Sequence, residues 1–194
     1  MTARWGAVCV SCLLALPARA APAAAQATPV AELAIFRAWL DRVHPGYGRD
    51  EGPAPFRNTT VNAAYGGRRF YYVLTYARGM GPRFPKPLSL VAHVNDSGTV
   101  MPLKLSSVAT FQPGLRKVAT PAGARRAAAA VLILATGDPG ERRWKFQDTL
   151  IAVRRTRHGW ACTYRHGSAS HTSQVTFDRR GLLSAISVNA PPVP

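Results

Sequence analysis

The chain has 194 residues, of which 47% are hydrophobic and 18% are charged. This composition is typical of a folded protein and argues against a disordered one, and the length suits one domain or two small domains that share a core. Lys and Arg number 25 against nine Asp and Glu, which gives a formal net charge of +16. So few carboxylates disfavour oxygen-ligand metal cages and enzymes that work with paired carboxylates.

Residues 1–20 have the pattern of a secretory signal peptide. Arg4 supplies a positive start, residues 5–16 are apolar, and Ala18-Arg19-Ala20 fits a cleavage site. A second site, Ala25-Gln26-Ala27, makes residue 27 the alternative end. The apolar segment is shorter than the ~20 residues that span a bilayer. The sequence therefore predicts a periplasmic or secreted protein of bacterial type, with no transmembrane segment after cleavage.

A helix is expected directly after this segment. Thr28 can cap it, Pro29 suits its first turn, and Pro45-Gly46 ends it. Within it, Leu33, Phe36 and Leu40 recur at the spacing of one helix face. This pattern predicts an amphipathic helix that covers a sheet.

Four strands are expected to follow the first helix, over residues 58–65, 68–77, 86–94 and 99–106. Gly66-Gly67 predicts a tight hairpin turn between the first two strands, because both glycines tolerate positive φ. Asn95-Asp96-Ser97-Gly98 predicts the turn between the last two strands.

The second half of the chain repeats this order. Ala27-Thr28-Pro29 recurs as Ala119-Thr120-Pro121, before an apolar helix expected over residues 124–135. Strands are then expected over 147–156, 159–166, 171–178 and 181–188, and Asp178-Arg179-Arg180-Gly181 matches the first closing turn. The predicted fold class is α+β, with two tandem α-β-β-β-β repeats (28–106 and 119–190) joined by residues 107–118 and helices packed on antiparallel sheet.

The closing hairpins, in which an acid or amide precedes a glycine and an aliphatic residue, resemble those of PepSY modules. The arrangement as a whole is similar to tandem PepSY-like or cystatin-like modules. This resemblance implies an extracytoplasmic binding or inhibitory role, although the inhibitory loop motifs of cystatins are absent.

Five residues are candidates for a binding surface. Arg68, Arg69 and Tyr71 begin a strand that interleaves cations with aromatic rings, and Arg154 and Arg155 form a second basic pair. The alternative for the first group is a core strand that leaves Tyr71 half exposed. The positive charge itself has two interpretations, attraction to an acidic partner or compositional bias.

Cys162, His166 and His171 are candidate metal ligands, because thiolate and imidazole suit copper(I) or zinc. The competing interpretation places Cys162 in a core-facing row with Trp160 and Tyr164, as a small buried hydrophobe. No other cofactor is expected.

The predicted function is therefore non-enzymatic binding or inhibition of an acidic macromolecular partner through a basic surface. The partner is expected to be a protein or an anionic envelope component, with nucleic acid as a further option. One alternative is an NTF2-like protein whose enclosed pocket binds or converts a small molecule, with His93 beside Asp96 or Asp148. A further alternative is a copper- or zinc-binding envelope protein. The chain has neither the nucleophile motif G-x-S-x-G nor a glycine-rich phosphate loop.

Overall fold

The computed structural model describes residues 28–45, 51–75, 88–136, 148–166 and 172–188. The predicted signal segment, residues 1–20 with the alternative end at 27, lies outside these residues. Among the helices of the described ranges, none combines the length and apolar character needed to cross a bilayer.

Both long helices begin as the repeated Thr-Pro motif predicts. In α1 (Pro29–Val43) the Thr28 hydroxyl accepts from the backbone N–H of Ala31 at 3.3 Å. In α3 (Pro121–Thr136) the Thr120 hydroxyl accepts from the N–H of Gly123 at 3.1 Å. Each cap satisfies a donor that the first turn of a helix leaves free. The two predicted helices are confirmed.

The strands form two antiparallel sheets of four, each in chain order. Sheet 1 contains β1 (Glu51–Pro55), β2 (Tyr71–Thr75), β3 (Leu88–Val94) and β4 (Val100–Pro102). Sheet 2 contains β5 (Asp148–Thr156), β6 (Gly159–His166), β7 (Thr172–Asp178) and β8 (Leu183–Ser187). A short helical turn, η1 (Val108–Thr110), lies between the halves. The predicted α+β class, with two tandem α-β4 units, is confirmed.

One predicted strand is wrong. Residues 58–65 contain the helix α2 (Thr59–Tyr65), capped by the Asn58 side chain, which accepts from the N–H of Val61 at 3.1 Å. Gly66 ends this helix in the left-handed conformation, with φ of 61°, so the glycine pair is not a hairpin turn. The first strand is instead β1, and helical spacing lets α2 bury Val61, Ala64 and Tyr65 together.

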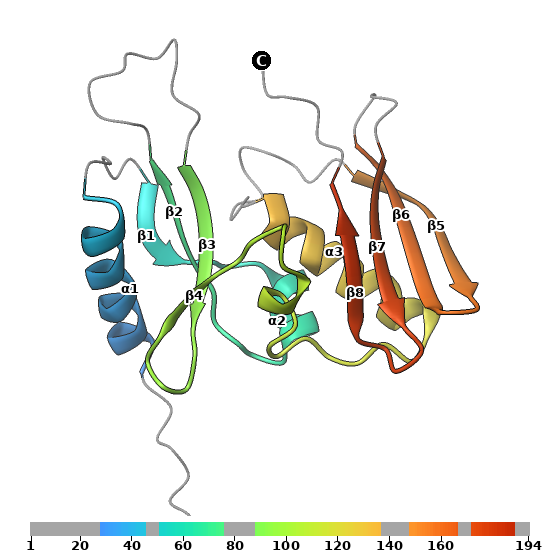
Figure 1. The fold of residues 1–194 in the computed structure, drawn as a ribbon, viewed down its shortest axis with the longest axis horizontal. Helices are drawn as coiled ribbons and strands as arrows, with labels where there is room; N and C mark the ends of the chain where they lie inside the picture. The colour runs from blue at the N-terminus through green and yellow to red at the C-terminus, as the bar shows by residue number, and fades with distance from the viewer. Residues whose placement is uncertain (1–27, 46–50, 76–87, 137–147, 167–171, 189–194) are drawn as a thin grey trace, which may run out of the picture.

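The elements stack in four layers, in the order α1, sheet 1, the helices α2 and α3, and sheet 2 (Figure 1). Phe36 and Leu40 of α1 pack on one face of sheet 1, against Tyr71, Val73 and Ala92. The opposite face of sheet 1 joins the larger core around α2 and α3. Because sheet 1 is covered on both faces, Tyr71 is 0% exposed, and the expectation of a half-exposed Tyr71 is wrong.

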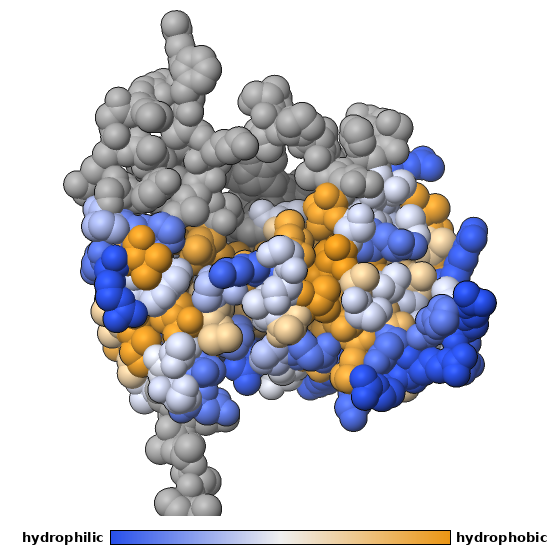
Figure 2. Space-filling model, viewed as in Figure 1, coloured by the Kyte–Doolittle hydropathy of each residue, from blue (hydrophilic) through white to orange (hydrophobic). Residues whose placement is uncertain are grey.

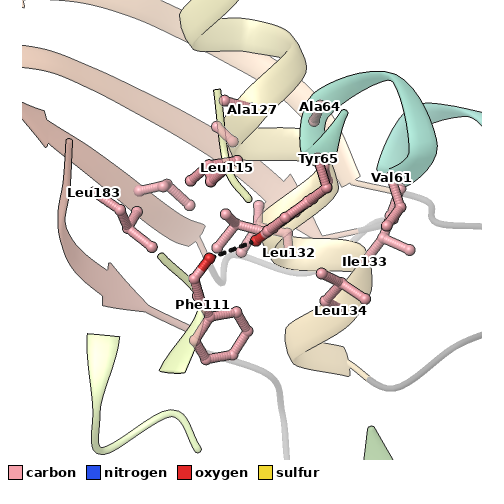
Figure 3. Packing of buried hydrophobic residues seen from close by; sticks show 14 of the residues in the cluster. Val61, Ala64, Tyr65, Phe111, Leu115, Ala127, Leu132, Ile133, Leu134 and Leu183 are labelled. Carbon is pink, nitrogen blue, oxygen red and sulfur yellow. Dashed lines mark hydrogen bonds between the residues drawn. The ribbon is translucent and has the colours of Figure 1, made fainter. Parts of the chain in front are cut away.

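The larger core fills the space between the two sheets. Side chains of α2 and α3 meet there with residues from the connection between the halves and with Leu183 of β8 (Figure 3). The buried Tyr65 hydroxyl donates to the carbonyl of Phe111 at 3.0 Å. Burying a hydroxyl is costly unless it is hydrogen-bonded, so this contact fixes α2 against the connection.

Sheet 1 is covered by helices on both of its faces, whereas the described helices cover sheet 2 on one face only. When the closing turns are aligned, Ala92 and Val94 of β3 correspond to Val175 and Phe177 of β7, and all four are buried toward a helix. On the other face, Val91 and His93 are buried, whereas the corresponding Gln174 and Thr176 are exposed or half-buried. Sheet 2 thus ends the stack with a polar face. The residues on this face include Thr149, Ala152, Arg154, Ala161, Thr163, Arg165, Thr172, Gln174, Thr176, Ser184, Ala185 and Ser187.

Candidate anion-binding surface

Two turns of sheet 2 lie next to each other at one end of the sheet. The strand register pairs Thr156 with Gly159 across the first turn, and pairs Gly159 with Asp178 at the start of the second. Antiparallel pairing therefore gathers arginines that are far apart in the sequence. We call the five exposed arginines of these turns and the adjoining strand end the arginine patch: Arg154, Arg155, Arg157, Arg179 and Arg180.

The patch is visible as the strongly hydrophilic corner of the molecule beneath sheet 2 (Figure 2). In Figure 1 the β5–β6 and β7–β8 connections lie at this same end of the sheet. Sequence reasoning singled out Arg154 and Arg155 but missed Arg157, Arg179 and Arg180. The matched turn Asp178-Arg179-Arg180-Gly181 was the signal that, combined with antiparallel pairing, would have found them.

Three of the five guanidinium groups are each held by a contact of their own Nε atom. Nε of Arg179 donates to the carbonyl of Arg157 at 2.6 Å, and Nε of Arg157 donates to Nε2 of His158 at 2.8 Å. Nε of Arg180 lies 3.2 Å from Oδ2 of Asp178. Within the described residues these contacts use no Nη atom of the three side chains. The outer edges of the guanidinium groups therefore remain free to donate to a ligand.

The remaining two arginines lie on opposite faces of β5. Arg155 pairs with Trp160 across the strands and places its guanidinium 5.8 Å from the centre of the indole ring, a cation–π contact. Arg154 pairs with Ala161 and lies on the polar outer face. The patch thus reaches both faces of the sheet end.

Asp178 is the one carboxylate within the two turns. Its pKa is held below the usual value, first by the hydrogen bond from the backbone N–H of Leu182, and also by Arg180. Because Oδ1 accepts from the N–H groups of Arg180 and Leu182, each at 2.9 Å, this carboxylate shapes the turn. It offsets one of the five positive charges.

Arg69 and Tyr71 take part in a different arrangement, on sheet 1. Nη2 of Arg69 lies 3.1 Å from Oε1 of Glu32, and the Tyr71 hydroxyl donates to Oε2 of Glu32 at 2.7 Å. Burial raises the pKa of Tyr71, and the hydrogen bond to Glu32 adds to this effect. These contacts join α1 to β2, and the helical layer separates them from the arginine patch.

The half-buried Arg68 packs beside the buried His93. Nη1 of Arg68 lies 3.3 Å from Nδ1 of His93, and Arg68 Nε and His93 Nε2 are both buried without a hydrogen-bond partner in the described residues. Burial lowers the pKa of His93, and the nearby charge of Arg68 lowers it further. The charged group in contact with the His93 ring is therefore a cation, and no hydrogen bond joins the ring to Asp96 within the described residues. The side chain of Asp148 lies outside what the structure describes, so the predicted His93–Asp148 pair stays a prediction.

Cys162 is fully buried among the residues that face α3, and burial raises the pKa of its thiol to about 11. His166 ends β6, but its side chain lies outside what the structure describes, as does the whole of His171. Among the described residues, no three potential ligands gather in a way that could hold a metal ion. The copper or zinc site therefore stays a prediction.

Comparison with known proteins gives no match to a family model, to a curated protein or to a solved structure. The fold itself defines the class, a tandem α-β4 protein of the α+β type with a hydrophobic core between its two sheets and arginines gathered on one end of its second sheet.

Proposed function

We propose that this protein is a non-enzymatic binding protein that engages an acidic macromolecular partner through the arginine patch. One observation carries the proposal: antiparallel pairing brings five exposed arginines to one end of sheet 2, and three of them are anchored through Nε. Anchoring lowers the entropy that these side chains lose on binding, because each contact at Nε restricts the conformations of its side chain before the partner binds.

The packing between the sheets supports binding at the surface over chemistry in an enclosed pocket. The helices α2 and α3 and their apolar side chains occupy the region between the sheets. The patch and the outer face of sheet 2 present exposed polar groups that a ligand can reach. The resemblance to PepSY-like modules and the predicted signal segment support a binding or inhibitory role outside the cytoplasm.

Compositional bias is the competing explanation of the positive charge, and a paired set of variants separates the two. The patch variant replaces all five patch arginines by glutamine. The control variant makes the same change in net charge on the first half and its connection, at exposed cations. Its substituted residues are Arg37, Arg42, Arg57, Lys104 and Lys117.

Affinity for immobilised heparin is the measurement. If the patch is the binding surface, the patch variant elutes below about 0.15 M salt, while the parent and the control variant elute well above it. Equal losses in the two variants would show that net charge alone produces retention, and the proposal would be wrong. Circular dichroism of each variant checks that the fold is kept.

A further inference from the structure

The structure points to the chemical class of the partner. We infer that the arginine patch docks on a membrane surface through the phosphates of anionic phospholipid headgroups, without inserting apolar side chains. This inference rests on the proposed function, since it identifies what the same patch binds.

The residue type of the patch favours phosphate as its ligand. Every cation in it is arginine, and the free Nη edges of Arg157, Arg179 and Arg180 present pairs of N–H donors. Arginine donors of this geometry match the oxygens of a phosphate, whereas a lysine offers a single point charge. A group of four to eight cations is also the number that is typical of segments that bind anionic lipid.

The shape of the surface that carries the arginines suits a planar partner. Three of them lie on two adjacent turns and two on the adjoining end of β5, at an outer corner of the molecule and not in a groove (Figure 2). Adjacent strands are ~4.8 Å apart, so two turns separated by two strand spacings lie about 10 Å apart. A planar layer of headgroups can meet both turns at once.

The two turns of the patch carry no exposed large apolar residue among those that the structure describes. Protein interfaces depend on buried aromatic and aliphatic anchors, and charged residues are depleted at their centres. The exposed large apolar residues of the described chain are Val30, Val43, Leu105 and Ile151, and none of them is in the two turns. Single-stranded nucleic acid is bound by stacking on aromatic rings, and the indole beside the patch, Trp160, is half-buried and already covered by Arg155.

The experiment measures co-sedimentation of the protein with lipid vesicles. Residues 28–194 contain every described element, and omitting residues 1–27 prevents their apolar segment from binding lipid by itself. Vesicles of phosphatidylcholine alone are compared with vesicles of equal parts phosphatidylcholine and phosphatidylglycerol. Each is tested at low salt and at physiological ionic strength of about 0.15 M.

We expect binding to the anionic vesicles alone, with weaker binding as salt rises. Each arginine near an anionic surface contributes about fivefold in affinity, so Arg179→Gln with Arg180→Gln lowers the affinity about 25-fold. Arg37→Gln with Arg42→Gln removes the same charge from α1, and should change the affinity less than a few fold. Fluorescence of the tryptophans should show no blue shift, because no indole enters the hydrocarbon.

Competing partners are separate arms of the same experiment. Patch-dependent retention on heparin without any binding to anionic vesicles would refute the lipid inference and leave the proposed function standing. The lipid inference would also be wrong if duplex DNA or poly-glutamate bound through the patch more tightly than the vesicles do. Loss of heparin binding that is equal in the patch and control variants would refute the proposed function itself.

Discussion

Asn95 and Asp178 hold the same position in the two halves and make the same pair of hydrogen bonds. Oδ1 of Asn95 accepts from the N–H groups of Ser97 and Thr99, at 3.1 and 2.8 Å. Oδ1 of Asp178 accepts from Arg180 and Leu182, again two and four residues ahead. The internal repeat therefore extends from the order of elements to the individual contacts of a turn.

This equivalence predicts how substitutions at the two positions behave. Asn95→Ala and Asp178→Ala each remove the acceptor that closes the turn, so each should lower the midpoint of thermal unfolding by a few degrees. Asn95→Asp and Asp178→Asn keep an acceptor oxygen and should lower the midpoint of thermal unfolding less than the alanine variants do. Calorimetry of the four variants tests this, and a swap that costs as much as its alanine variant would contradict the shared role.

The glycines that end these turns provide a matched pair. Gly98 and Gly181 have φ of 77° and 76°, so alanine has a similar backbone cost of about 1 kcal/mol at either position. A Cβ at Gly98 meets only Ile35, at 3.9 Å, whereas one at Gly181 would collide with the backbone of Val118. We expect Gly181→Ala to cost clearly more than Gly98→Ala in urea unfolding. Equal costs would mean that residue 118 is not docked on the second hairpin.

The contacts of Glu32 predict that α1 is attached through a polar network as well as through Phe36 and Leu40. Tyr71→Phe removes the hydroxyl that donates to Glu32, which should cost about 1–2 kcal/mol of unfolding free energy. Glu32→Ala removes the partner of both Tyr71 and Arg69 and should cost at least as much. The double variant should cost less than the sum of the two, because the residues share an interaction. Simple additivity would show that the network contributes nothing beyond packing.

His93 predicts a loss of stability in mild acid. Because burial and Arg68 lower its folded pKa, the unfolded chain binds a proton more readily than the native protein does once the pH falls below about 6.5. The stability that neutral His93 provides is fully present above that pH and declines as the pH falls toward the folded pKa. One proton accounts for at most about 1.4 kcal/mol per pH unit. Urea unfolding between pH 7.5 and 5 measures the slope, and His93→Gln should flatten it; an unchanged slope would assign the effect to other groups.

Cys162 should resist a thiol reagent in the native protein and react once the protein is denatured. The thiol is buried and its pKa is raised to about 11, so neither access nor ionisation favours reaction. Cys162→Ala should cost on the order of 1 kcal/mol of stability and leave binding intact. Residues 28–194 contain no other cysteine, so the assay reports this thiol alone. Rapid native labelling, or loss of a bound metal ion in the variant, would favour the metal site instead.

The sequence by itself determined the elements whose signals are local. Thr28 and Thr120 mark helix starts because a side-chain oxygen caps the free N–H groups within three residues. Gly98 and Gly181 mark turns because their backbone conformation strains other residues. The alternation of Cys162, Tyr164 and their neighbours distinguished the buried face of β6 from its more exposed face, because successive side chains of a strand point to opposite faces.

The tertiary structure decided what depends on neighbours far away in the chain. Thr59, Thr60 and Val61 are β-branched and suit a strand, yet packing against α3, together with the caps at the two ends, makes residues 59–65 a helix. Tyr71 and His93 are buried because a helix from each half covers one face of sheet 1, and no pattern within residues 68–94 contains that information. The arginine patch likewise exists only through antiparallel register, which places residue 157 beside residue 179. Spatial proximity between distant residues is a property of the folded chain, because it depends on which layers pack together and not on local conformation.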